Sequence, residues 1–221
     1  MKVALQFAMP SELHALPGLK DRQPSAVISG IPIYELAPDL LAACGGVGKV
    51  NAAMCAQILC RHYRADLILN SGVAGCLTDL PIGALVLAED FVQHDVDTTA
   101  VGDPIGLVST VNTVTFPTWD PARCREILAE LGHPAESGRV ASGDWFAVKG
   151  DRAAWIRDTF HPVLTEMEGG AIAQAAALSG VPFGVIRVIS DLADGTAPSS
   201  FDQFEQETAD RSAATTGRTS S

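Results

Sequence analysis

The segment from Phe183 to Asp191 constrains the fold of this chain more strongly than any other. It reads Phe-Gly-Val-Ile-Arg-Val-Ile-Ser-Asp, so it is apolar except for Arg187 until it stops abruptly at Ser190. A run of this kind predicts a strand that is buried on both faces. In α/β proteins, ligands usually bind at the carboxyl ends of such strands. Asp191 would be poorly hydrated at that edge, which disfavours its charged form, and we therefore consider it a candidate acid.

The composition is that of a compact α/β protein of ordinary size. The chain has 221 residues and a formal net charge of −11, with only 15 basic residues, which are scattered along it. A nucleic-acid partner requires clustered Lys and Arg, so that class of function is disfavoured. A small neutral or cationic ligand fits the charge better.

The cysteines and the N-terminus predict the compartment. The five cysteines are odd in number and have no CxxC spacing. Most of them lie in apolar stretches, which predicts buried, reduced thiols of the kind found in the cytoplasm. Val3–Met9 is too short for a signal sequence, and no apolar stretch reaches membrane-spanning length. We therefore expect a cytoplasmic protein that has no membrane partner.

Strand and helix patterns alternate along the chain, with no linker between them and no internal repeat. They predict a single-domain, mixed and largely parallel twisted sheet flanked by helices, over residues 1–211, with a polar and frayed tail at 212–221. The predicted strands are Lys2–Phe7, Ala26–Ser29, Ile31–Glu35, Leu40–Ala43, Ala65–Asn70, Ala84–Val92, Arg139–Ser142, Pro162–Glu166 and the run to Ser190. The predicted helices are a short one from Ser11, then Val47–Tyr63, Pro121–Leu131, Lys149–Phe160, Glu168–Ser179 and a last one from Ser200.

Two glycine-rich segments follow predicted strands. Gly45–Lys49 and Ser71–Gly75 are expected to form turns that allow a ligand close to the backbone, with helix N-termini behind them. Neither the Walker A pattern nor the dinucleotide fingerprint fits, because Val50 and Asn51 stand where those patterns need Ser or Thr and a third glycine. The glycines could equally serve tight turns alone. The carboxylates and the aromatic ring expected at other strand ends favour a nucleoside over a phosphate or a metal.

Several short motifs then occur in a specific order. They are Ala8-Met9…Glu12, Gly46-Val-Gly-Lys-Val-Asn-Ala-Ala53, Asn70-Ser-Gly-Val-Ala-Gly75, His94-Asp-Val-Asp97, Ser142-Gly-Asp-Trp-Phe146, Glu166-Met-Glu168 and Ser190-Asp-Leu-Ala-Asp194. Over residues 1–208 their order and spacing resemble the purine nucleoside phosphorylase superfamily and, within it, the 5'-methylthioadenosine/S-adenosylhomocysteine nucleosidases. Phosphorylases of that superfamily lack a glutamate at the position of Glu12, which favours water over phosphate as the nucleophile.

The resemblance implies cleavage of a purine–ribose bond with no cofactor and no metal. Asp191 would donate a proton to N7 of adenine, and Glu12 would take a proton from the attacking water. Glu168 would bind the ribose 2'- and 3'-hydroxyls and stabilise the oxocarbenium-like transition state. Ser190 and Arg187 would orient Asp191 and the water, although Arg187 could equally be a structural ion-pair partner.

The resemblance also implies the residues that surround the substrate. Phe146 would stack on adenine, the backbone of Ala147 would contact the base edge, and Met167 would lie beneath the sugar. The remaining residues of the implied substrate site are Met9 and Phe201 at the 5'-substituent, Val47, and Gly75.

Three features depart from the family pattern. Val73 stands where a serine is common near the water, and Val101 replaces a larger aromatic residue in a loop that closes the neighbouring subunit's pocket in family dimers. The C-terminal helix is expected to be shorter and more polar than usual. His94, Asp95 and Asp97 have the residue types of a metal site, but a loop or subunit-contact role is expected instead.

The sequence thus predicts a hydrolase that releases adenine from 5'-methylthioadenosine, S-adenosylhomocysteine or a related 5'-modified adenosine, and that forms a homodimer. Two alternatives stay open at this point: a phosphorylase that uses phosphate, and a non-catalytic purine-binding protein on the same fold. An aminodeoxyfutalosine substrate also stays open, because the motifs do not rank the 5'-substituents.

Overall fold

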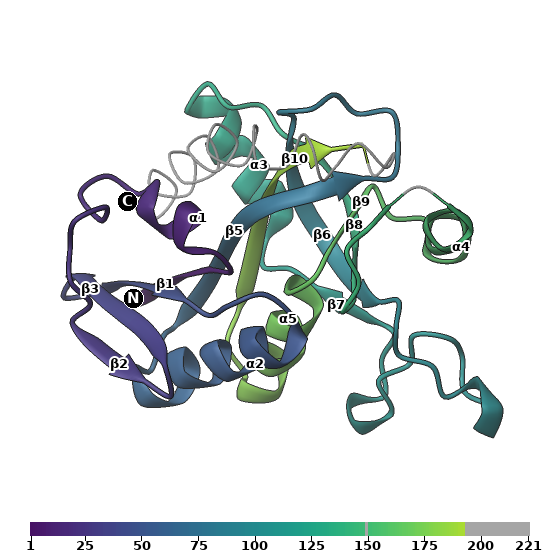
Figure 1. The fold of residues 1–221 in the computed structure, drawn as a ribbon, viewed down its shortest axis with the longest axis horizontal. Coiled ribbons are helices and arrows are strands. Elements are labelled where there is room, and N and C mark those ends of the chain that lie inside the picture. The colour runs from purple at the N-terminus through teal and green to yellow at the C-terminus, as the bar shows by residue number, and fades with distance from the viewer. Residues whose placement is uncertain (149, 193–221) are drawn as a thin grey trace.

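The run from Phe183 to Asp191 forms a strand, β10, in which every residue is buried. The computed structural model describes residues 1–148 and 150–192, and it places β10 in a mixed sheet of ten strands (Figure 1). The predicted α/β class and mixed sheet are therefore confirmed. The other strands are β1 (Val3–Phe7), β2 (Ala26–Ile28), β3 (Ile31–Ala37), β4 (Leu40–Cys44), β5 (Leu67–Cys76), β6 (Leu85–Gln93), β7 (Thr115–Pro117), β8 (Glu136–Ser142) and β9 (Leu164–Glu166).

The sheet closes on itself around β10. On one side β10 runs parallel to β5, and on the other it runs antiparallel to β6. From β6 the sheet continues through β8 to β9, and β9 pairs again with β5. On the far side of β5, β1 and β4 extend the sheet in parallel, and β3 and β2 follow as an antiparallel meander. The sequence predicted the mixed sheet and the meander but not the closure.

The closure brings the ends of four strands to one place. Thr165 of β9 pairs with Gly75 of β5, and Gly75 pairs with Asp191 at the end of β10. On the other flank of β9, Ser142 at the end of β8 pairs with Glu166. Segments that are far apart in the sequence therefore meet at one edge, as expected for a ligand site in an α/β fold.

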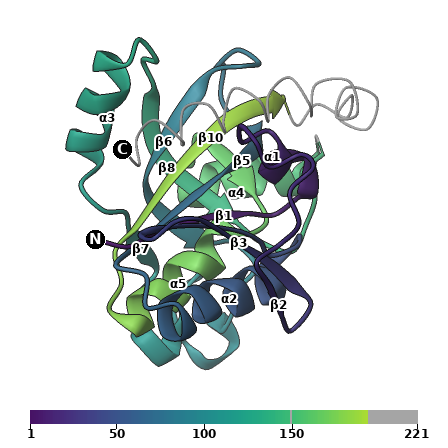
Figure 2. The same cartoon turned by 90° about the vertical axis from the view of Figure 1, so that its left-hand side faces the viewer.

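The helices cover the sheet much as their sequence periodicity predicted. Helices α2 and α5 pack side by side against the sheet, and α3 lies on β6 (Figures 1 and 2). Helix α5 ends at Gly180, whose φ of 69° is the left-handed conformation that glycine adopts most readily at a helix end. Within the described residues, the α-helices are α1 (Pro10–His14), α2 (Lys49–Gln57, continued by a π-helical turn over Ile58–His62), α3 (Pro121–Glu130), α4 (Asp151–Phe160) and α5 (Gly169–Ser179). Short 3-10 helices cover Thr99–Val101 and Ser109–Val111.

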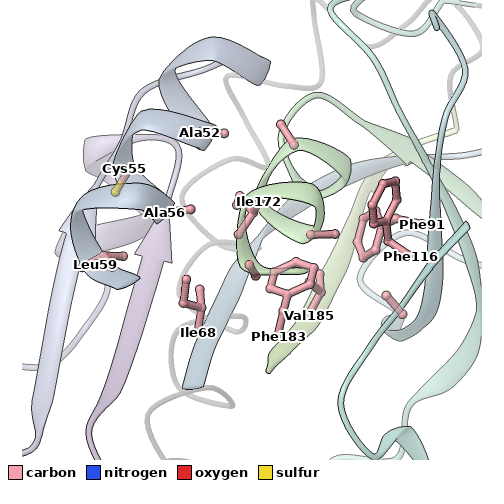
Figure 3. Close-up of a cluster of buried hydrophobic side chains, with 14 of the residues drawn as sticks. Ala52, Cys55, Ala56, Leu59, Ile68, Phe91, Phe116, Ile172, Phe183 and Val185 are labelled. Carbon is pink, nitrogen blue, oxygen red and sulfur yellow. The ribbon is translucent and has the colours of Figure 1, made fainter. Parts of the chain in front are cut away.

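Small side chains let α2 approach the core closely. Ala52, Cys55 and Ala56 are fully buried between α2, α5 and the sheet (Figure 3). By contrast, Val50 and Met54 are 71% and 44% exposed, although both contributed to the helical period in the sequence. The helix prediction is confirmed, but Val50 and Met54 face away from the core, whereas Leu59 in the π-helical turn is fully buried.

One predicted turn is wrong. Ser71–Gly75 was expected to follow a strand as a glycine turn in front of a helix, but it is the second half of β5. The strand continues because β10 pairs with it as far as Gly75 and β9 pairs with Gly75 and Cys76. The glycines keep this central strand thin, so that side chains from other elements reach its backbone.

Some predictions fall outside the described residues: Lys149, the helix from Ser200, Phe201, Asp194 and the boundary at residue 211.

All five cysteines are free, and all except Cys124 are buried, as predicted. Among residues 1–148 and 150–192, none of the helices combines the length and apolar character that crossing a membrane would require.

Candidate active site

A cavity of about 260 Å³ opens where the strand ends meet. It is bordered by the segment after β1, the loops after β4 and β8, the second half of β5, the segment from β9 to α5, and the end of β10. Its lining residues are Ala8, Met9, Glu12, Val47, Val73, Ala74, Gly75, Trp145, Phe146, Ala147, Thr165, Glu166, Met167, Glu168, Ser190 and Asp191.

The cavity gathers nearly all the residues that the sequence predicted for the site. Of the predicted residues, Arg187 does not line it and Phe201 lies outside the described part of the chain. The structure adds Trp145 and Glu166, to which the sequence analysis gave no role. Both belong to motifs that resemble the family, so their place in those motifs was the signal that could have found them.

Glu12 is held in place by backbone amides. It lies in the first turn of α1 and is 3% exposed. Its Oε2 accepts hydrogen bonds from the amides of Ala8 and Met9, each at 3.0 Å, and its Oε1 accepts one from the amide of Val73 at 3.1 Å. Burial raises the pKa of Glu12 above its ordinary value, although these amides and the positive charge of Arg187 oppose the rise. The carboxyl group is therefore oriented and able to exchange a proton.

Arg187 forms a buried ion pair behind the cavity. Its Nη2 lies 2.6 Å from Oε2 of Glu166 and donates to Oδ1 of Asn70, also at 2.6 Å. Glu166 also accepts hydrogen bonds from Ser142 and from the amide of Gly169 at the start of α5. Two roles were considered for Arg187: orienting Asp191 and the water, or forming a structural ion pair. Its contacts with Glu166 and Asn70 favour the ion pair. A buried pair of this kind is costly to break, because the remaining charge is left without a partner.

Glu168 is the second buried glutamate of the Glu-Met-Glu motif. It precedes α5, is 9% exposed, and accepts a hydrogen bond from the amide of Gly48 at 2.8 Å. Burial and the nearby charge of Glu166 raise its pKa to about 8, against the opposing influence of Gly48 and Arg187. An electron-poor ligand placed beside Glu168 would favour its charged form.

This raised pKa predicts how stability depends on pH. A carboxyl group whose pKa is higher in the folded chain leaves stability unaffected below its unfolded pKa, and stability then falls as pH rises through about 8. We expect the thermal midpoint of Glu168→Gln to exceed that of the parent at pH 9 but to equal it near pH 4.5, as measured by calorimetry. The exposed Glu136→Gln is the control, and equal midpoints of Glu168→Gln and parent at pH 9 would contradict the expectation.

Asp191 and the loop after β8 face the same cavity. Asp191 is 4% exposed, and its Oδ2 accepts a hydrogen bond from the Ser190 hydroxyl at 2.9 Å. The role predicted for Ser190, orienting Asp191, is compatible with this contact and stays a prediction. Phe146 lines the cavity and is 43% exposed, so an aromatic ring borders the space beside the carboxyl groups. The site thus combines buried carboxyl groups with an aromatic ring.

The residues considered for a metal do not form a metal site. Asp95 pairs with Lys49, and Asp97 accepts hydrogen bonds from Thr99 within its own loop. In the part of the chain that the structure describes, no group of three or more His, Cys, Asp and Glu side chains is arranged to hold a metal ion.

Comparison with known proteins identifies the family of this chain. The sequence pattern of the phosphorylase superfamily matches residues 2–219. A 5'-methylthioadenosine/S-adenosylhomocysteine nucleosidase of Geobacillus kaustophilus is 36% identical, with 96% of this chain and 94% of that protein covered.

Two solved structures share the fold at similar identity. The S-adenosylhomocysteine nucleosidase of Streptococcus pyogenes, in complex with methylthiotubercidin, has a TM-score of 0.89 and 34% identity, with 99% of this chain and 95% of that one covered. The futalosine hydrolase of Helicobacter pylori has a TM-score of 0.92 and 29% identity, with 99% of this chain and 96% of that one covered.

Proposed function

Because this chain belongs to the 5'-methylthioadenosine/S-adenosylhomocysteine nucleosidase family of the phosphorylase superfamily, we propose that it releases adenine from these two nucleosides by hydrolysis. The family consists of N-glycosidic hydrolases, and the chain is an enzyme of that class. The observation that carries the proposal is the convergence of Glu12, Glu168 and Asp191 on one cavity.

The reaction breaks the bond between N9 of adenine and C1' of the ribose. Asp191 donates a proton to N7, so that adenine leaves as a neutral base. Glu12 accepts a proton from a water molecule whose oxygen bonds to C1'. Glu168 binds the ribose hydroxyls and stabilises the positive charge that develops on the sugar. Each proton moves between a carboxyl group and the substrate or water, so no cofactor is needed.

The binding residues complete this proposal. Phe146 stacks on the adenine ring, and Ala147 contacts the base edge through its backbone. Met167 lies beneath the sugar, and Met9 contacts the 5'-substituent together with Phe201. Gly75 and Val47 border the substrate, and both line the cavity. We assign Arg187 to holding Glu166 in place rather than to Asp191.

Adenine release with and without phosphate tests the proposed function. We expect the protein to release adenine from 5'-methylthioadenosine in phosphate-free buffer, at a rate that added phosphate does not change. Turnover only with phosphate would indicate a phosphorylase instead. Binding without turnover in either buffer would indicate a purine-binding protein. Glu12 and Asp191 both face the cavity, and a protein that only binds purines needs neither an acid nor a base.

The same assay with other nucleosides tests the substrate class. A futalosine hydrolase shares the fold at a TM-score of 0.92, which supports a futalosine-type nucleoside, the class of the aminodeoxyfutalosine left open by the sequence, as a further substrate. The exposed Val101, in a loop away from the described cavity, leaves room for a larger 5'-group if a second subunit covers the site.

Gly72 gives a prediction about the placement of Glu12. A Cβ atom at Gly72 would lie 2.5 Å from Oε1 of Glu12 and 3.4 Å from Nη1 of Arg187. We expect Gly72→Ala to displace the Glu12 carboxylate and to lower kcat for adenine release by about 10²-fold. The matched control is Gly184→Ala on neighbouring β10, where the added Cβ meets only the flexible end of Leu69 at 2.9 Å. Equal kcat values for the two variants would refute this reason for the glycine.

A homodimer is part of the proposal, and the outer face of α2 supports it. A groove between α2 and α5 is lined by exposed apolar side chains. They are Val50 and Met54 of α2, which are 71% and 44% exposed, and Leu178 of α5, which is 57% exposed. We expect the parent to sediment as a dimer and Val50→Lys/Met54→Lys to sediment as a monomer. A monomeric parent would contradict this assembly.

The free cysteines support the cytoplasm as the compartment.

A further inference from the structure

Three polar residues close a ring of interactions beside the cavity. The Lys49 ammonium lies 2.6 Å from Oδ1 of Asp95, and the amide of Asp144 donates to Oδ2 of Asp95 at 2.9 Å. The ring is completed by the amide of Lys49, which donates to Oδ1 of Asp144 at 2.8 Å. Asp95 uses both carboxylate oxygens and so joins the start of α2 to the loop after β8.

Each of the two joined segments also reaches the cavity. Gly48, directly before Lys49, holds Glu168 through its backbone amide at 2.8 Å. The loop that begins at Asp144 continues into Trp145, Phe146 and Ala147, all of which line the cavity. The ring therefore fixes the position of the sugar side of the site relative to its base side.

The surroundings of Asp95 make this connection rigid. Asp95 and Lys49 are each 19% exposed. Burial alone would raise the pKa of Asp95, but the Lys49 ammonium and the Asp144 amide hold it below its ordinary value, so the carboxylate stays charged. His94 next to it is 2% exposed, lies against Gly143, and meets the Trp145 ring edge-on at 6.3 Å. The loop after β8 thus packs on His94 through Trp145, and the bond from the Asp144 amide to Asp95 holds its start in place.

We propose that Asp95 is a positioning residue that holds the loop of Phe146 and Ala147 against the segment that orients Glu168. This proposal rests on the proposed function for its kinetic consequences. Asp95 itself lies outside the cavity lining. Its effect on the reaction passes through Asp144 and Lys49, so losing it misplaces the stacking ring and the sugar-binding carboxylate together.

The kinetic test compares Asp95→Asn and Asp95→Ala with the parent. An asparagine presents one acceptor and one donor to two groups that both donate, so even this isosteric change loses one of the two bonds. Either the Asp144 amide loses its partner, or the Lys49 ammonium keeps only its bond to Oε1 of Gln93 at 3.1 Å. We expect kcat/KM for adenine release to fall by about 10- to 100-fold, with KM raised and kcat lowered. If Asp95→Ala does not fold, Asp95→Asn decides the outcome.

The matched control is Asp90→Asn. Asp90 forms an equally close ion pair with Arg139, at 2.6 Å and 26% exposed, but lies outside the cavity lining. Both pairs are partly buried, and Asp90 accepts from Arg139 through both of its oxygens. We therefore expect both variants to lower the thermal midpoint, so that the comparison separates a loss of stability from a loss of activity. We expect Asp90→Asn to keep kcat/KM within about twofold of the parent. An equal fall in both variants would overturn the proposal, because it would show a general loss of structure.

A spectroscopic arm needs no turnover. Trp119→Phe/Trp155→Phe leaves Trp145 as the only tryptophan, since the chain has three. In this background we expect Asp95→Asn to increase the quenching of Trp145 fluorescence by acrylamide, and Asp90→Asn to leave it unchanged. Unchanged quenching in Asp95→Asn, or a kcat/KM equal to that of the parent, would overturn the proposal. A parent without nucleosidase activity would refute the proposed function alone, and quenching would then decide the role of Asp95.

Discussion

Asp191→Asn is expected to lower the rate of adenine release from 5'-methylthioadenosine by about 10²- to 10⁴-fold. Asparagine has nearly the same shape and can still accept the hydrogen bond from the Ser190 hydroxyl, which lies 2.9 Å from the Asp191 carboxyl group. It cannot transfer a proton to N7, so the base would have to leave as an anion. The measurement is kcat under saturating substrate, and near-normal kcat would refute the assignment of Asp191 as the acid.

A ligand without N7 separates catalysis from binding in this experiment. Methylthiotubercidin carries a C–H group at the position of N7, so it cannot accept the proton. We expect the parent not to cleave it, and we expect parent and Asp191→Asn to bind it with similar affinity. A large loss of affinity in the variant would mean that Asp191 acts mainly in binding.

Glu12→Gln is expected to lower kcat by a similar factor, about 10²- to 10⁴-fold, because glutamine cannot accept a proton from the water. The dependence of kcat on pH is a second test of Glu12 as the base. The base must be deprotonated, and burial raises the pKa of Glu12, so activity of the parent falls as pH drops through that raised pKa. We expect the residual activity of Glu12→Gln to lack this acidic limb.

The control for Glu12→Gln is its KM. The amide oxygen of a glutamine can keep the bonds from Ala8 and Met9 but not the one from Val73. None of these amides belongs to the base-binding loop, so KM should change less than kcat. A variant that keeps both the parent's kcat and its acidic limb would show that another group activates the water.

The sequence predicted the elements of this fold well because their signals are local. The apolar run to Asp191, the Ser29-Gly30 hairpin turn and the glycine at the end of α5 each depend on neighbouring residues, and all three are present as predicted. Closure of the sheet depends instead on pairing between β9 and β5, which are far apart in the chain. Periodicity carries no information about such long-range pairing.

The site shows the same division. Motif resemblance placed Glu12, Glu168 and Asp191 together, and the cavity contains all three. It did not reveal that Glu166 and Arg187 form a buried pair, because either residue alone is compatible with several roles. The extension of β5 through Ser71–Gly75 was missed because glycines normally weaken strands. Here, pairing on both edges of β5 outweighs that preference.

The fate of the water oxygen tests the central claim most directly. The protein is incubated with 5'-methylthioadenosine in water enriched in oxygen-18, with phosphate also present, and the sugar product is analysed by mass spectrometry. If Glu12 activates water, the parent forms 5-methylthioribose with the heavy oxygen at C1, trapped by borohydride reduction as it forms so that ring opening does not exchange this oxygen with the solvent. Glu12→Gln then forms the same labelled product at least about 10²-fold more slowly. A sugar 1-phosphate as the product, or an intact substrate, would contradict the account.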